Sequence, residues 1–86
     1  MKYIVDNKWM DTDKSELILR EEFGRYERSL YVTPKQNYFI QELDCIKGGS
    51  IGLSCTKEEA IELTKKYRPY RVKSFFPEIL SELEEG

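Results

Sequence analysis

The residue types in this sequence that could most readily do chemistry are the cations of residues 65–73. The segment reads KKYRPYRVK, so its cations alternate with aromatic rings and no acidic side chain interrupts them. Proteins that hold single-stranded nucleic acid use this combination, because cations contact phosphates and rings stack on bases. A nucleic acid or an acidic protein is therefore one candidate partner. The contact residues would be Lys65, Lys66, Arg68, Tyr70, Arg71 and Lys73.

The same segment has a structural interpretation, which we favour. A helix is expected to end near Tyr67, and cations in the last turn of a helix complement the negative end of its dipole. Tyr67 would then belong to the core. The acidic residues that follow in the chain would neutralise the cations; they are Glu78, Glu82, Glu84 and Glu85.

Groups for catalysis and for metal binding are scarce. The chain has no histidine, which is the commonest general base and the commonest metal ligand. Its carboxylates are dispersed, and 86 residues offer little room for a cleft that raises the pKa of a catalytic acid. The stretch from Gly48 to Gly52 lacks the Lys-Ser/Thr pair of a phosphate loop. We expect no enzyme, no catalytic residue, no metal and no cofactor. A weaker interpretation of the carboxylates is a surface that imitates a phosphate backbone.

Composition is that of a small folded protein. Hydrophobic residues make up 40% and charged residues 35% of the chain, which suits a single domain over residues 1–86. The net charge of −2 provides no general attraction for nucleic acid or anionic membranes. No apolar run is long enough for a transmembrane helix and no signal peptide is recognised, so we expect a cytoplasmic protein that binds no membrane. Cys45 and Cys55 are expected to be reduced, core-filling residues.

Local signals predict a run of antiparallel strands in the middle of the chain. Residues 29–33 and 37–43 are rich in β-branched and aromatic side chains and flank residues 34–36, which is typical of a hairpin. The Gly48-Gly49 pair supplies the positive φ angles of a second tight turn, so a third strand should follow it.

A helix should follow these strands. Thr56 and Glu59 have the spacing of a capping box, in which each side chain bonds to the backbone N–H of the other. The helix is expected over Lys57–Tyr67, with one apolar stripe that packs on the sheet.

The ends of the chain are less clearly patterned. Residues 1–11 form either a short hairpin or one bent strand, and residues 15–23 favour a strand over a helix. Residues 70–75 are expected as a short strand with Tyr70 and Val72 facing inward, and residues 77–83 as a last helix that begins at a proline. The predicted fold class is α+β: an antiparallel β-meander of about four strands, with one helix packed on a face and a short C-terminal helix.

The loop of the central hairpin decides which side chains face the core. A loop of two or four residues pairs Val32 with Phe39 and Tyr31 with Ile40, and alternate side chains then fall on opposite faces. We expect one core face under the helix, with Trp9 at least half buried. The expected core residues are Leu30, Val32, Phe39, Leu43, Leu53, Ile61, Leu63 and Tyr67.

The opposite face carries hydroxyls and a carboxylate, which suits contact with water or with a partner. Tyr31 and Tyr38 should be diagonal neighbours there, and tyrosines are frequent in binding hot spots. We predict that this face contacts a protein partner, or a second copy of the chain in a homodimer. The predicted contact residues are Tyr31, Tyr38, Ile40 and Glu42. The competing interpretation is that the C-terminal helix or residues 1–10 cover this face.

Several stretches of the chain together resemble a known class of proteins. They are residues 8–16 (KWMDTDKSE), 29–33 (SLYVT), 38–40 (YFI) and 56–60 (TKEEA). Over residues 8–64 the pattern is similar to small, mostly uncharacterised accessory proteins of phages and mobile elements of Gram-positive bacteria. In that pattern a turn glycine is common where Asn37 stands, and residues 65–73 lie outside it. The resemblance implies a β-meander with a packed helix and no known catalytic residue. Some such proteins inhibit host defence by binding to it, as anti-CRISPR proteins do.

These observations favour a non-catalytic protein that binds a protein partner, with inhibition of a host defence system as the role that the resemblance implies. The alternative is a nucleic-acid-binding accessory protein that uses residues 65–73. Salt distinguishes the two, because binding through about five phosphate contacts weakens steeply with salt. Binding through a contact that is centred on tyrosines does not weaken steeply with salt.

Overall fold

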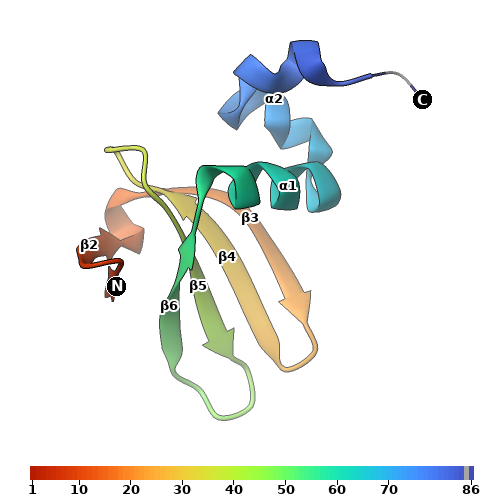
Figure 1. Ribbon diagram of the computed structural model, residues 1–86. Coiled ribbons are helices and arrows are strands. Elements are labelled where there is room, and N and C mark those ends of the chain that lie inside the picture. Colours follow the sequence, from red (N-terminus) through yellow and green to blue (C-terminus); the bar gives the residue numbers. More distant parts are fainter. Residues whose placement is uncertain (85) are drawn as a thin grey trace.

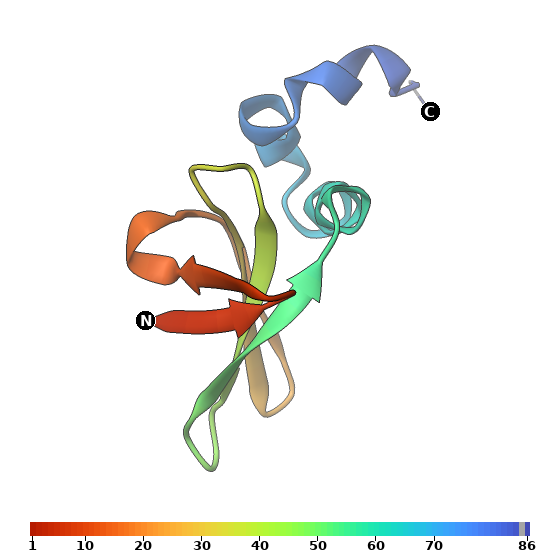
Figure 2. The same cartoon turned by 60° about the vertical axis from the view of Figure 1, so that its left-hand side comes forward.

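The computed structural model describes residues 1–84 and 86, and its centre is a four-stranded antiparallel sheet (Figure 1). The strand order β3-β4-β5-β6 is a meander. Helical segments form a layer at one side of the sheet, and a separate two-stranded hairpin, β1–β2, crosses it (Figure 2). The expected α+β fold is confirmed.

The strands are β1 Lys2–Val5, β2 Lys8–Asp11, β3 Glu16–Phe23, β4 Tyr26–Val32, β5 Tyr38–Asp44 and β6 Ser50–Cys55. The helices are η1 Thr12–Lys14, α1 Lys57–Tyr67, η2 Pro69–Arg71, α2 Val72–Phe75 and η3 Pro77–Glu82.

The loop between β4 and β5 holds an odd number of residues. The Thr33 N–H donates to the Asn37 carbonyl at 2.8 Å, which leaves residues 34–36 as the loop. Gln36 has a φ of 65°, the left-handed conformation that closes three-residue hairpin loops. The expected loop of two or four residues is therefore wrong.

This odd loop shifts the pairing of β4 and β5 by one residue from the expected register. Val32 pairs with Tyr38, and Tyr31 pairs with Phe39. Because side chains alternate along a strand, a shift of one residue exchanges the faces of β5 relative to β4. Phe39 therefore joins Tyr31 on one face, and Ile40 joins Val32 on the other.

The helical layer covers the face that carries Leu30 and Val32. Phe76 is fully buried there, and its ring lies 5.7 Å from the ring of Tyr38. The buried Thr64 hydroxyl donates to the Ala60 carbonyl at 2.7 Å, so this buried polar group has a partner. The buried residues of this first core are Ile18, Leu19, Leu30, Val32, Tyr38, Cys55, Ala60, Val72, Phe76 and Ile79. Five expected core residues, Leu43, Leu53, Ile61, Leu63 and Tyr67, are only partly buried.

The capping box of α1 is present as expected. The Glu59 N–H donates to Thr56 Oγ1 at 3.1 Å, and the Thr56 N–H donates to Glu59 Oε1 at 3.2 Å. The expected strand over residues 15–23 is confirmed as β3. The register of β3 against β4 shifts between Leu17 and Leu19, which inserts one extra residue into β3.

The chain after α1 is helical, so the strand expected over residues 70–75 is wrong. Val72, Phe76 and Ile79 are buried, and their spacing of four and then three residues is that of one helical face. Tyr70, which was expected to face inward, is exposed. The helix expected over residues 77–83 is present as the 3₁₀ helix η3.

Hairpin β1–β2 covers the other face of the sheet and builds a second core there. Asp6 and Asn7 have φ angles of 51° and 64°, which is the conformation of a two-residue type I′ turn. The hairpin alternative for residues 1–11 is therefore confirmed, and the expectation of one open sheet face is wrong. The buried residues of the second core are Val5, Met10, Tyr31 and Phe39, with Tyr3 partly buried beside them.

Gly52 in β6 allows the hairpin to approach the sheet closely. A Cβ atom at this position would lie 2.7 Å from Tyr3 Cβ and 2.8 Å from Val5 Cγ2. The Tyr3 Cβ is fixed to the backbone of β1, so a larger side chain would have to displace the hairpin itself.

Both cysteines are free thiols. Cys55 belongs to the first core, and burial together with the nearby Glu59 carboxylate raises the pKa of its thiol to about 11. Cys45 is exposed in the turn after β5, where its N–H donates to the Arg25 carbonyl at 2.7 Å. A core-filling role is therefore confirmed for Cys55 and wrong for Cys45.

Candidate partner-binding surface

The predicted tyrosine surface does not exist as an open face. Tyr31 is 9% exposed and Tyr38 is 8% exposed, and they lie on opposite faces of the sheet. Tyr31 stacks on Phe39, with ring centroids 5.3 Å apart. Burial raises the pKa of Tyr38. The error follows from the odd loop, which separates the two tyrosines, and from the hairpin and helical layer, which cover both faces.

The other two residues of that predicted surface are also engaged within the fold. Ile40 is partly buried against the first core. The Arg28 Nε donates to Glu42 Oε2 at 2.9 Å in an ion pair. Both alternatives considered for this face hold in part, because residues 1–10 cover Tyr31 and the C-terminal helical segments cover Tyr38.

The arginines of residues 65–73 turn toward the sheet. β3 is an edge strand, and its outward carbonyls would otherwise lack partners. The Arg68 guanidinium donates to the Arg20 carbonyl at 3.2 Å and forms an ion pair with Glu21. The Arg71 guanidinium donates to the Ile18 carbonyl. These arginines therefore fasten the helical layer to the exposed edge of β3.

The other members of the segment are dispersed over the helical layer. The Lys65 Nζ lies 3.2 Å from Glu62 Oε1, and the Lys66 Nζ lies 5.2 Å from the ring centroid of Tyr67. Tyr70 and Lys73 are exposed, but the two arginines between Lys65 and Lys73 point away from solvent to reach β3. The structure thus does not bring the predicted contact residues together as one cationic platform.

A different pair of side chains is exposed together on hairpin β1–β2. Ile4 and Trp9 are directly paired across the two strands, so both project from the face of the hairpin that points away from the sheet. Ile4 is 66% exposed and Trp9 is 69% exposed. The expectation that Trp9 is at least half buried is wrong, because its strand neighbour Met10 takes the inward position.

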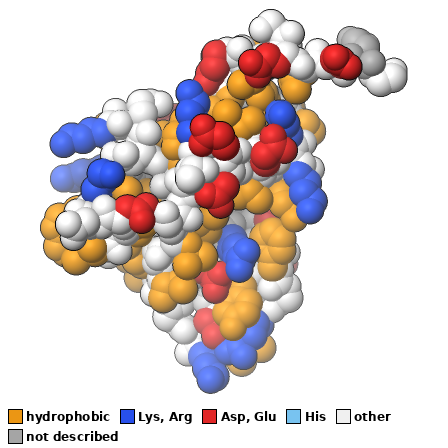
Figure 3. Space-filling view, in the orientation of Figure 1, with side chains coloured by type: hydrophobic (Ala, Val, Ile, Leu, Met, Phe, Trp, Pro, Cys, Tyr) orange, Lys and Arg blue, Asp and Glu red, His pale blue; other side chains and the backbone are white. Residues whose placement is uncertain are grey.

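A groove of about 550 Å³ lies beside Trp9. Its lining comes from β2, from η1 and from the β4–β5 loop, three segments that are distant in the sequence. In Figure 3, cationic and hydrophobic side chains lie side by side at the left-hand edge of the molecule, over this region. The lining residues are Lys8, Trp9, Asp11, Lys14, Ser15, Thr33, Pro34, Lys35 and Asn37.

The rim of the groove is cationic. Lys8, Lys14 and Lys35 are all exposed, and none of them forms an ion pair within residues 1–84 and 86. The Asp11 carboxylate of the groove lies 3.6 Å from the Met1 amino group and accepts the Asp13 N–H at 3.0 Å. The side chains of these three lysines are therefore available to an external anionic group.

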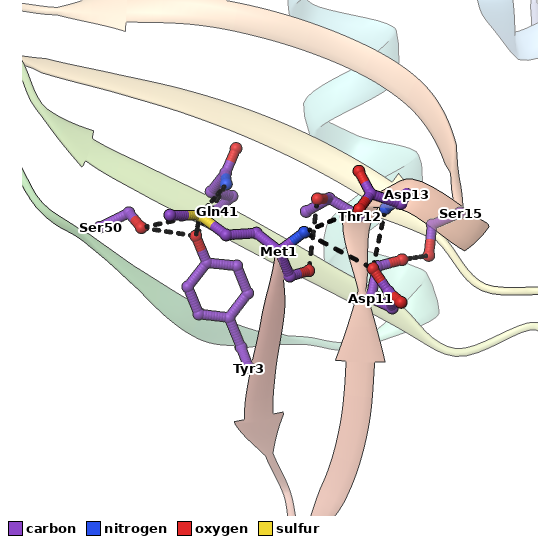
Figure 4. A network of polar contacts seen from close by, with 8 residues as sticks. All are labelled: Met1, Tyr3, Asp11, Thr12, Asp13, Ser15, Gln41 and Ser50. Carbon is purple, nitrogen blue, oxygen red and sulfur yellow. Dashed lines mark hydrogen bonds and ion pairs between the residues drawn. The ribbon is translucent and has the colours of Figure 1, made fainter.

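Polar contacts hold the hairpin that carries this surface (Figure 4). The Gln41 side-chain amide donates to the Tyr3 hydroxyl at 2.7 Å, and Tyr3 shares a further hydrogen bond of 2.6 Å with the Ser50 hydroxyl. At the same open end of the hairpin, the Ser15 hydroxyl donates to the Asp11 carbonyl at 2.7 Å. Together with the close packing at Gly52, these contacts make the hairpin a firm support for Trp9.

One signal in the sequence could have located Trp9 on the outside. A two-residue turn at Asp6-Asn7 pairs Tyr3 with Met10, which places Trp9 opposite Ile4 and away from the inward positions. The groove itself has no comparable signal, because its three lysines are separated along the chain and meet only when the hairpin docks on the sheet.

Comparison of the chain with protein-family models, with curated proteins and with solved structures gives no significant match in any of the three. Within the described part of the chain, no group of three or more Cys, His, Asp or Glu side chains is arranged to hold a metal ion. No helix in that part is both long and apolar enough to cross a membrane.

Proposed function

We propose that this protein is a non-catalytic module that binds a protein partner through Ile4 and Trp9 on the outward face of hairpin β1–β2. The observation that carries the proposal is the exposure of Trp9 on a hairpin whose other face is locked into a core. Tryptophan is among the residues most enriched in binding hot spots, because it removes a large apolar area from water when it is covered. A firmly held support also limits the entropy that is lost on binding.

The charges around Trp9 favour an acidic partner. Lys8, Lys14 and Lys35 form a cationic rim next to an apolar centre, and opposite charges at the rim of an interface accelerate association and exclude wrong partners. A host defence protein is the class of partner that the resemblance to mobile-element proteins suggests. An inhibitor of that kind needs no catalytic group, since it acts by occupying a surface of its target.

Nucleic-acid binding through residues 65–73 has less support. Arg68 and Arg71 already bond to carbonyls of β3, so a nucleic acid would have to compete with the fold for them. The net charge of −2 provides no general attraction for a polyanion.

The proposal is tested by affinity capture from host lysate treated with nuclease, followed by reconstitution with the purified partner. The site variant is Ile4→Ser/Trp9→Ser. The matched control is Ile46→Ser/Ile51→Ser, which removes two apolar side chains that are 74% and 53% exposed in and after the β5–β6 turn. We expect the wild type and the control to retain the partner and the site variant to lose it by at least about tenfold in affinity.

Three results would contradict the proposal. Equal binding by both variants would place the contact elsewhere on the molecule. Loss of capture on nuclease treatment would favour the nucleic-acid alternative. A change of oligomeric state in the site variant, measured by sedimentation velocity, would mean that Ile4 and Trp9 contact a second copy of the chain.

A further inference from the structure

The groove beside Trp9 combines an apolar wall with a charged rim, and the combination narrows the chemistry of its ligand. Trp9 and Pro34 come from the hairpin and from the β4–β5 loop, and both line the groove. A volume of about 550 Å³ lies within the range of sites that enclose a small ligand or a few side chains. The exposed ring makes a flat apolar surface against which an aliphatic or aromatic side chain can pack.

We propose that this groove binds an extended acidic peptide segment of the partner, with one apolar side chain between Trp9 and Pro34 and carboxylates that reach the rim lysines. This inference rests on the proposed function and specifies what the partner presents. The three lysines belong to β2, η1 and the β4–β5 loop, so three separate segments of the fold contribute cations to the groove. A ligand that pairs with all three must carry several anionic groups near its apolar anchor.

The groove also offers polar groups for the backbone of an extended segment. Asn37, which follows the β4–β5 loop, is among the residues that line the groove. Its backbone N–H is already satisfied, because it donates to the Thr33 hydroxyl at 3.1 Å. The side-chain amide has one acceptor and two donor positions, which suits the carbonyl and N–H groups of a peptide.

Carboxylates beside the groove favour a peptide over a nucleic acid. Asp11 lines the groove, and the exposed Asp13 follows it in η1. A nucleic acid carries a negative charge on every nucleotide, so its backbone would pass close to these carboxylates. A peptide can place its carboxylates at the lysines and neutral residues near Asp11 and Asp13.

The chain contains a single tryptophan, so its fluorescence reports directly on the groove. The probes are short synthetic peptides with Leu or Phe at the centre and Asp and Glu on both sides. Two control sets keep the length: in one the centre is Ser, and in the other Asn and Gln replace the acids. A third probe is single-stranded oligothymidylate. We expect a saturable change of Trp9 emission with the acidic apolar peptides, and binding at least about tenfold weaker with either control set.

Lysine variants of the protein measure how much the charges of the groove contribute to the affinity for the peptides. Lys8→Gln/Lys14→Gln/Lys35→Gln should lower the affinity for the acidic apolar peptides by about tenfold or more. The matched control Lys47→Gln/Lys66→Gln/Lys73→Gln removes three exposed lysines elsewhere and should leave the affinity unchanged. Circular dichroism checks that both variants are folded.

The outcomes separate this inference from the proposed function. Tighter binding of oligothymidylate than of any peptide, equal binding by the two lysine variants, or no saturable change at millimolar peptide would each overturn the inference. If the Ile4→Ser/Trp9→Ser variant still fails to bind the partner in any of these cases, the proposed function stands and only the ligand chemistry is wrong. If the peptides bind as expected but the partner does not require Ile4 and Trp9, the proposed function fails instead.

Discussion

The helical layer and hairpin β1–β2 cover opposite faces of the same sheet, but they use their charged side chains differently. In the helical layer, Arg68 and Arg71 point inward and bond to the carbonyls of an edge strand. Beside the hairpin, Lys8, Lys14 and Lys35 point outward and form no ion pair within the described residues. The two arginines of the dense run are thus structural, and the lysines of the groove are available to a partner.

The comparison teaches that density along the chain is a poor guide to an available charge. Arg68 and Arg71 follow a helix that ends near the unpaired edge of β3, and such an edge needs donors. Arginine is suited to this task because its guanidinium has several donors on a long side chain. The lysines of the groove lie on a hairpin, a short helix and a loop, where no such demand exists.

The largest expected effect tests whether the residues packed between hairpin β1–β2 and the sheet form a stable core of their own. Phe39 and Phe76 are both fully buried, one in the core of each layer. Phe39→Ala and Phe76→Ala should each lower the free energy of unfolding by about 3–5 kcal/mol. Urea denaturation monitored by circular dichroism measures both. A loss below about 1 kcal/mol for Phe39→Ala alone would mean that the hairpin is only loosely attached.

A second test addresses the structural role of the arginines. Arg71→Met removes the donor to the Ile18 carbonyl and should lower the free energy of unfolding by about 1.5–3 kcal/mol, the range for hydrogen bonds with a charged partner. Lys73→Met is the matched control, since Lys73 is exposed two residues later, and it should change stability by no more than about 0.5 kcal/mol. Equal effects would remove the difference between the two groups of cations.

The close approach at Gly52 gives a third prediction. Gly52→Ala should lower the free energy of unfolding by about 1–3 kcal/mol, because the new Cβ overlaps Tyr3 and Val5. Hydrogen exchange should show the loss of protection mainly in β1 and β2. Ile51→Ala changes an exposed side chain on the same strand, and it should lower the free energy of unfolding by less than about 1 kcal/mol. Unchanged exchange in the hairpin would mean that it can shift without penalty.

The smallest expected effect concerns the lysines of the groove. Lys8→Gln/Lys14→Gln/Lys35→Gln should change the free energy of unfolding by no more than about 0.5 kcal/mol, because exposed charges without partners contribute little to stability. Thermal and urea denaturation of the triple variant measure this. A marked loss of stability would show that these lysines serve the fold, as the arginines do.

Local patterns were sufficient for most of the secondary structure. The capping box at Thr56 and Glu59 defined the start of α1, β-branched and aromatic runs located β4 and β5, and the Gly48-Gly49 turn located β6. The helical turns after Pro69 were missed because Tyr70 and Val72 suggested alternation. The buried Val72, Phe76 and Ile79 show the helical period only when the window extends beyond residue 75.

The sequence by itself determined the meander, the helix and the scarcity of catalytic groups, since these depend on residue types and on spacings of a few residues. Only the tertiary structure decided which tyrosines are buried, where Trp9 points and which cations are available. The odd loop at residues 34–36 sets the faces of β5, and the docking of a hairpin at Gly52 covers one face while it exposes Trp9. Such outcomes depend on contacts between residues far apart in the chain, and no local pattern contains them.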